Sequence, residues 1–125
     1  MPTQNNLIGS GCAPLQAQAS VGIPSTGLTA TGNAQSNALQ LGSDLAIFTT
    51  VAASTGCKLL GTAACNLGDT IIVVNHGVST LSVYPNTTSG KIANGSAGAA
   101  FSVGSNKTAW FINVGSDLWA ASVSA

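Results

Sequence analysis

Apolar and polar residues alternate along much of this chain with a period of two residues. Leu45 and Ile47, for example, fall on one side of an extended backbone, and Phe48 falls on the other. Such alternation is typical of strands, and runs rich in Val, Ile, Thr and aromatic residues favour the same structure. The pattern predicts strands at 39–41, 45–51, 70–74, 80–84, 99–103, 107–114 and 118–123.

Short segments rich in Gly, Asn, Asp, Ser and Pro separate these runs. Such residues favour tight turns, and short strands about 8 to 12 residues apart are typical of a sandwich or barrel. The sequence therefore predicts an all-β fold, an antiparallel β-sandwich or jelly-roll-like domain. No repeat of about 20–50 residues is visible, which argues against a solenoid.

The start of the chain lacks the alternating pattern. Glycines and prolines recur between Gly9 and Gly27 and interrupt any helix or strand. We therefore expect an extended N-terminal arm at 1–26, followed by a β-sandwich domain at 27–125.

Two predicted strands are apolar on both faces, at 71–74 and 109–112. One face of an antiparallel sheet normally meets water, so the second face is expected to be covered by a loop or the arm, or by a neighbouring subunit. The interface candidates in these strands are Ile72, Val74 and Phe111. The candidates in the arm, which could reach a groove or sheet edge on a neighbour, are Leu7, Ile8, Leu15, Val21 and Ile23.

Charged residues are scarce, at 5% of the chain with a formal net charge of +0, against about 25% in an ordinary soluble domain. A protein that stays soluble alone normally has a charged surface, whereas uncharged polar side chains are easier to bury at a protein contact than ions are. The composition therefore indicates an assembly subunit and favours a neighbouring subunit as the cover. We expect a homo-oligomer, because 125 residues with few bulky side chains form a thin core.

The same scarcity argues against two classes of partner. Three scattered lysines form neither the basic footprint of a nucleic-acid-binding protein nor the basic face of a membrane-surface helix. No apolar run approaches the length of a transmembrane helix, about 20 residues, and the polar start of the chain does not resemble a signal peptide. We expect synthesis in the cytoplasm without a signal peptide.

Few residues are available for catalysis. His76 lies between Asn75 and Gly77, which favour positive φ, and an exposed turn histidine is the simpler interpretation. Asp69 and Asp117 follow turn residues, where Asp commonly accepts hydrogen bonds from turn amides. We expect no enzyme and no catalytic or cofactor site; a small hydrolase stays an alternative, because catalytic side chains can meet from distant positions.

The cysteines and aromatic residues leave further alternatives open. Cys57 and Cys65 could pair across a hairpin, although cytosolic synthesis favours reduced thiols. One His and no Cys-x-x-Cys pair do not predict a metal site. Tyr84, Trp110 and Trp119 could pack in a core or interface, or could together form a sugar-stacking platform.

One order of turns and apolar strands runs through most of the chain, carried by 27–32, 38–41, 48–51, 55–56, 68–75, 81–85 and 119–120. This order resembles that of small structural proteins of tailed bacteriophage virions, including capsid decoration (cement) proteins and head-fibre or tail-associated modules. The resemblance carries no catalytic residues to this chain, and the segment around Cys57 and Cys65 does not match the pattern.

The resemblance implies a β-rich homo-oligomer, expected as a trimer, on the capsid surface. Its partners would be itself and the major capsid protein, and its function would be to stabilise the shell. The alternative among virion proteins is a tail or fibre module that binds a host glycan through Tyr84 and the tryptophans.

Overall fold

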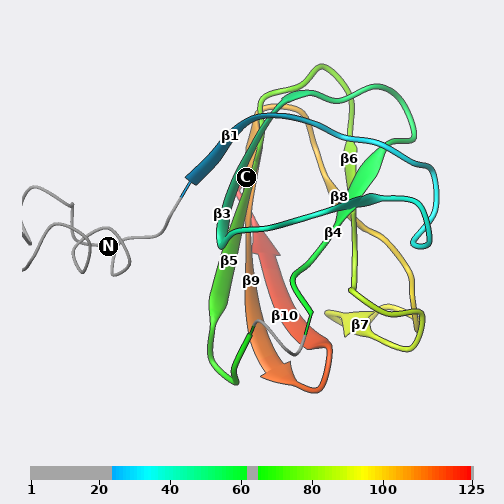
Figure 1. Cartoon of the computed structure of the whole chain (residues 1–125), viewed down its shortest axis with the longest axis vertical. Coiled ribbons are helices and arrows are strands. Elements are labelled where there is room, and N and C mark those ends of the chain that lie inside the picture. The colour runs from blue at the N-terminus through cyan, green and yellow to red at the C-terminus, as the bar shows by residue number, and fades with distance from the viewer. Residues whose placement is uncertain (1–23, 62–64, 125) are drawn as a thin grey trace, which may run out of the picture.

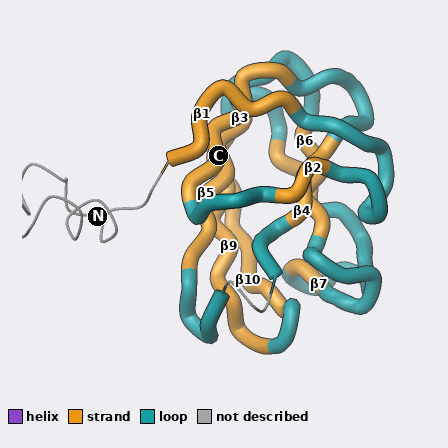
Figure 2. Tube along the Cα trace, viewed as in Figure 1, coloured by secondary structure: helices purple, strands orange, loops and turns teal. Residues whose placement is uncertain are grey.

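The computed structural model describes residues 24–61 and 65–124, and within these ranges the chain contains strands and loops but no helix (Figure 2). The all-β class predicted from the sequence is therefore confirmed. The strands are β1 Pro24–Thr29, β2 Leu39–Gln40, β3 Leu45–Thr50, β4 Gly56–Lys58, β5 Thr70–Asn75, β6 Leu81–Tyr84, β7 Lys91–Ile92, β8 Phe101–Val103, β9 Lys107–Gly115 and β10 Leu118–Val123.

These strands form two sheets (Figure 1). A six-stranded sheet has the order β1-β3-β5-β9-β10-β7, and a four-stranded sheet has the order β2-β4-β6-β8. From β1 to β9 the chain passes from one sheet to the other at every step, and β9 and β10 alone follow each other within one sheet among the described strands. Each sheet therefore gains every second strand of the chain.

This alternation makes most strand pairs parallel. β1, β3 and β5 run parallel to one another, as do β2, β4 and β6, and β7 runs parallel to β10. The antiparallel pairs among the described strands are β5–β9, β9–β10 and β6–β8, so the predicted antiparallel arrangement is wrong for the pairs that the first six strands make with one another. A turn sequence marks where a chain reverses, but it does not say whether the next strand joins the same sheet or the opposite one.

The first six strands form three successive turns of a coil, each with one strand in either sheet. In the six-stranded sheet, these strands begin at Pro24, Leu45 and Thr70, so successive turns differ in length. Turns of unequal length leave no fixed period in the sequence. This is why the coil is invisible to a search for repeats.

Strand β1 begins inside the segment predicted as the arm. Pro24 is its first residue, a position where an edge strand tolerates proline. Gly27 has a φ of 66° and lies where the register of β1 against β3 shifts, a conformation that glycine adopts without steric cost. The first residues of β1 therefore fall inside the segment predicted as the arm, and residues 1–23 lie outside the described ranges.

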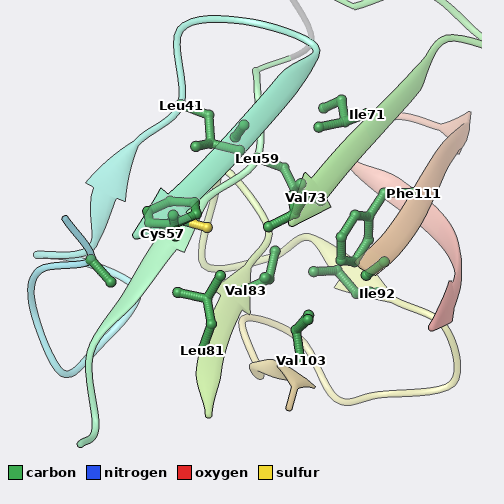
Figure 3. Packing of buried hydrophobic residues seen from close by; sticks show 14 of the residues in the cluster. Leu41, Cys57, Leu59, Ile71, Val73, Leu81, Val83, Ile92, Val103 and Phe111 are labelled. Atoms are coloured by element: carbon green, nitrogen blue, oxygen red, sulfur yellow. The ribbon is translucent and has the colours of Figure 1, made fainter. Parts of the chain in front are cut away.

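The core lies between the two sheets. Figure 3 shows Val73 and Phe111 from the six-stranded sheet together with Val83 and Val103 from the four-stranded sheet, all members of one buried cluster. The ring of Phe111 meets the ring of Phe101 edge to face, with centroids 5.5 Å apart. Buried side chains occupy alternate positions of β5, β6 and β9, which is the period of two that predicts them.

A buried asparagine links the two sheets at one end of the core. The Nδ2 of Asn75, at the end of β5, donates hydrogen bonds to the carbonyl oxygens of Ser79 and Val103, each at 2.9 Å. Its Oδ1 accepts a hydrogen bond from the backbone N–H of Gly77 at 2.9 Å. The sequence predicts a positive-φ turn here, but Asn75 and Gly77 both have negative φ, and the asparagine acts through its buried amide instead.

Candidate interaction surface

The outward side chains of four neighbouring strands form an apolar surface on the six-stranded sheet, which we call the outer face. Its members alternate with the core residues of β3, β5, β9 and β10 and carry no charge. They are Leu45, Ile47, Thr49, Thr70, Ile72, Val74, Thr108, Trp110, Ile112, Val114, Ala120 and Ser122.

The strand register brings the large apolar side chains of the outer face together. Ile72 on β5 lies opposite Leu45 on one side and Trp110 on the other. Ile112 on β9 lies opposite Ala120 on β10. Because directly opposed residues on one face have Cβ atoms about 4.5–5.5 Å apart, these side chains form a continuous surface across the four strands.

The outer face is open in the part of the chain that the structure describes. Trp110, Ile112 and Val114 are 39%, 43% and 49% exposed, and Ile72 and Val74 are half-buried. A sheet face that meets water normally carries polar residues, and a contiguous exposed apolar patch is typical of an interaction site. The outer face is therefore the candidate functional site.

The structure distributes the predicted interface residues unequally. Ile72 and Val74 lie on the outer face. The prediction of Phe111 as an interface residue is wrong, because Phe111 is fully buried opposite Ile71 and cannot touch a partner. The five arm candidates lie outside the described residues; they are Leu7, Ile8, Leu15, Val21 and Ile23.

Sequence reasoning missed the most exposed part of the outer face, which is Trp110, Ile112 and Val114. These three residues occupy alternate positions of β9 and therefore lie on one side of the strand. That spacing is the sequence feature from which a shared apolar surface could have been predicted. The opposite phase contains Phe111 but also Asn113, a polar residue that suggests exposure. Asn113 is nevertheless buried, and its Oδ1 accepts a hydrogen bond from the backbone N–H of Gly115 at 3.1 Å.

The aromatic residues of the suggested sugar platform do not meet on one surface. Trp110 lies on the outer face, whereas Tyr84 lies on β6 of the other sheet. The Tyr84 hydroxyl donates a long hydrogen bond to the carbonyl oxygen of Asn33, at 3.4 Å. Trp119 is 2% exposed and belongs to the core. Trp110 is therefore available to a partner and Trp119 is not.

Two of the candidate catalytic side chains, His76 and Asp69, lie in turns. His76 is exposed in the turn after β5, as predicted. The Asp69 carboxylate accepts a hydrogen bond from the backbone N–H of Asn66 at 2.8 Å, which confirms its expected role in a turn. Within residues 24–61 and 65–124, no group of three or more His, Cys, Asp or Glu residues could hold a metal ion.

Cys57 and Cys65 are both buried free thiols, so the disulfide that their spacing allows is not formed. Burial raises the pKa of the Cys57 thiol far above its usual range. Burial, with the carboxylates of Asp69 and Asp44, also raises the pKa of Cys65. Both thiols therefore stay protonated at neutral pH and are poor nucleophiles.

The carboxylate of Asp117 joins the β9–β10 turn to the loop after β6. It accepts hydrogen bonds from the backbone N–H of Asn86 at 3.2 Å, from the N–H and hydroxyl of Thr87 at 2.8 and 2.7 Å, and from the indole N–H of Trp119 at 3.1 Å. A Cβ at Gly90 would collide with this carboxylate, so glycine is needed there. The sequence predicts hydrogen bonds from the amides of the turn that contains Asp117, whereas the amides that it binds belong to a loop about 30 residues away.

The stability contributed by Asp117 is expected to depend on pH. Burial alone would raise the pKa of this carboxyl, but its hydrogen bonds outweigh burial and hold the pKa below the ordinary value. Such a group stabilises the fold above its unfolded pKa of about 3.9 and loses that contribution as the pH falls through the folded pKa. The Tm advantage of the wild type over Asp117→Asn should therefore be steady near pH 7 and shrink below about pH 4. Thermal unfolding across this range is the measurement, and an advantage that stayed constant in acid would contradict the assignment.

Comparisons with known protein families, with curated proteins and with solved structures each found no match for this chain. In the described ranges, no helix is long and apolar enough to span a membrane. The outer face is accordingly the feature from which a function is inferred.

Proposed function

We propose that this chain is a structural protein of a tailed-bacteriophage virion, a homo-oligomeric decoration (cement) protein that binds the outer capsid lattice and stabilises the shell. The observation that carries this proposal is the uncharged outer face, with Trp110, Ile112 and Val114 exposed, on a chain in which charged residues are 5%. The resemblance of its turn and strand pattern to small virion proteins supports the same function.

At the level of fold, we propose a β-sandwich of mixed strand direction as the scaffold. Both sheets contribute side chains to one buried cluster, as the two layers of a sandwich do. Such a scaffold holds the outer face on four hydrogen-bonded strands, and sites built on strands keep their geometry better than sites on loops.

The protein would act mechanically. Homo-oligomers, expected as trimers, bridge neighbouring major-capsid subunits and hold the shell against the pressure of packaged DNA. Their contacts supply buried apolar area, at about 25 cal/mol per Å². Ion pairs contribute little, because the chain has three Lys or Arg and three Asp or Glu residues in all.

Attachment to particles is therefore expected to be nearly independent of salt. The screening length falls from about 10 Å at 0.1 M to about 3 Å at 1 M salt, which weakens exposed ion pairs, whereas many salts preserve or strengthen apolar burial. Purified parent particles would be washed at both salt concentrations and pelleted. The copies of this chain per particle would then be counted by quantitative mass spectrometry against the major capsid protein.

We expect several hundred copies per particle, with little change between the two washes. A few to some tens of copies would instead place the protein in the tail and favour the glycan-binding alternative. Loss of most copies in the high-salt wash would contradict an uncharged contact with the capsid.

A further inference from the structure

The outer face carries two neighbouring rows of unlike size. The β9 row consists of Trp110, Ile112 and Val114, each at least 39% exposed. On the neighbouring strand β10, Ala120 and Ser122 are also exposed and form the β10 row, and the larger Leu118, 39% exposed, precedes them at the start of the strand. The antiparallel register sets Trp110 opposite Ser122 and Ile112 opposite Ala120, so each of these two large side chains stands beside a small one.

The edges of both sheets offer little room for partners. Edge strands β7 and β2 have two residues each, and β8 has three. The remaining edge, β1, is longer, but its register against β3 is irregular at two places. Short and irregular edges disfavour extension of a sheet by another chain. An association that uses the described residues is therefore expected through a face.

Because the outer face carries no charge, it favours a binding partner whose own surface has few charged residues. In an ordinary soluble domain about 25% of all residues are charged and almost none of these is fully buried unless paired, so covering such a surface with an uncharged face would desolvate its ions without a partner. A second copy of this chain, with 5% charged residues, avoids that cost. A self-contact also has to be complementary to itself, and adjacent large and small rows on one face meet this requirement.

We propose that the outer face binds other copies of this chain, with the β9 row of one copy packed over the β10 row of the next. The copies are the subunits of the homo-oligomer in the proposed function, on which this inference rests. The outer face is the surface through which these subunits meet. Two copies can make the contact reciprocally about a two-fold axis, and three can make it cyclically. In both cases, Trp110 and Ile112 lie over Ser122 and Ala120 of a neighbour.

The size of the face indicates a contact that dissociates. Four strands about 4.8 Å apart and about six residues long, at about 3.3 Å per residue, cover roughly 400 Å² per copy. Two such faces together fall below the area of stable interfaces, which starts near 1,200 Å². We therefore expect dissociation in the micromolar range in solution, and reinforcement where many copies are held on one lattice.

The test is the solution mass of the full chain over about 1–100 μM, by sedimentation velocity. The wild type should reach the mass of two or three chains, and Ile112→Lys, which places a charge in the centre of the face, should stay monomeric throughout. Val78→Lys is the matched control, because Val78 is 90% exposed in the turn after β5, outside the outer face, and it should behave as wild type. A monomeric wild type, or equal masses for the two lysine variants, would overturn the inference.

A second variant tests the packing of unlike rows. Ser122→Leu adds apolar area to the face but fills the space beside Trp110. The proposed packing predicts at least a tenfold increase in the dissociation constant, whereas association through apolar area alone predicts tighter binding and would overturn the row-on-row contact. Ile112→Thr keeps a β-branched side chain and should also weaken association, and it replaces Ile112→Lys if the lysine variant does not fold.

Measuring the binding of the wild type and of Ile112→Lys to particles, beside their mass in solution, distinguishes a failure of self-association from a failure of the decoration function. If Ile112→Lys keeps the wild-type mass but no longer binds particles, the outer face contacts the capsid protein; the self-association inference is then wrong and the decoration function stands. If the wild type associates through the outer face but is absent from particles, the inference stands and the decoration function is wrong.

Discussion

Asp117→Ala is expected to lower the free energy of unfolding by about 3 kcal/mol. The substitution removes the acceptor of four hydrogen bonds, of which the one from the Trp119 indole N–H is buried and the three from Asn86 and Thr87 are partly buried. A buried donor left unsatisfied costs about 1–3 kcal/mol, and a donor that water can reach costs less. Asp117 also has a φ of 48°, a conformation that costs alanine about 1 kcal/mol more than it costs Asp. Water entering the vacated space offsets part of the loss. Urea unfolding of both proteins at pH 7 measures the difference.

Two further variants separate the hydrogen bonds from the backbone conformation. Asp117→Asn tolerates positive φ and keeps one acceptor oxygen, so it should lose about half as much as the alanine variant. Asp69→Ala removes a carboxylate that bonds one exposed turn amide and should cost about 1 kcal/mol or less. If the Asp117 and Asp69 alanine variants were equally stable, Asp117 would be an ordinary turn residue and not a link between loops.

Phe111→Ala and Trp110→Ala are expected to have opposite consequences, although the residues are adjacent. Phe111 is fully buried against Phe101, and its truncation should lower the free energy of unfolding by about 3–5 kcal/mol. Trp110 is 39% exposed on the outer face, so its truncation should cost about 1 kcal/mol or less, through lost cross-strand contacts.

Both variants would be compared with the wild type by urea unfolding at a concentration where all three are monomeric. Dilution is needed because association stabilises the folded chain by mass action. Trp110→Ala should weaken self-association while leaving the monomer folded. A larger loss of stability for Trp110→Ala than for Phe111→Ala would reverse the faces assigned to β9.

The contrast within β9 shows what the pattern of residues could and could not predict. Period-two alternation predicts the existence of strands such as β5, β6 and β9, because a half-buried strand has to place unlike residues on its two sides. Where both sides are apolar, the pattern fixes two faces but not which one is inside. The pattern therefore allows Phe111 to be placed at an interface, although it is buried, and does not identify Trp110 on the opposite side of the strand as exposed.

Short strands and their order depend on tertiary structure. β4 has three residues, Gly56–Lys58, and glycine gives it no strand propensity. It exists because β2 and β6 flank it on either side in the sheet. Parallel pairing likewise follows from passage between two sheets, which local turn residues do not encode. The Asp117 site joins Thr87 to a turn 30 residues away, so no local motif could predict it.

We propose that this protein is a component of the outer capsid lattice, and a cryo-EM map of the parent particle would test this proposal. We expect density for the two-sheet domain on the outer surface of the shell, in contact with the major capsid protein. We also expect the outer faces of neighbouring copies, with Trp110 near the centre, to pack against one another. Density for this chain at the tail or a fibre tip, or no density on the shell at all, would show that the protein is not a decoration protein.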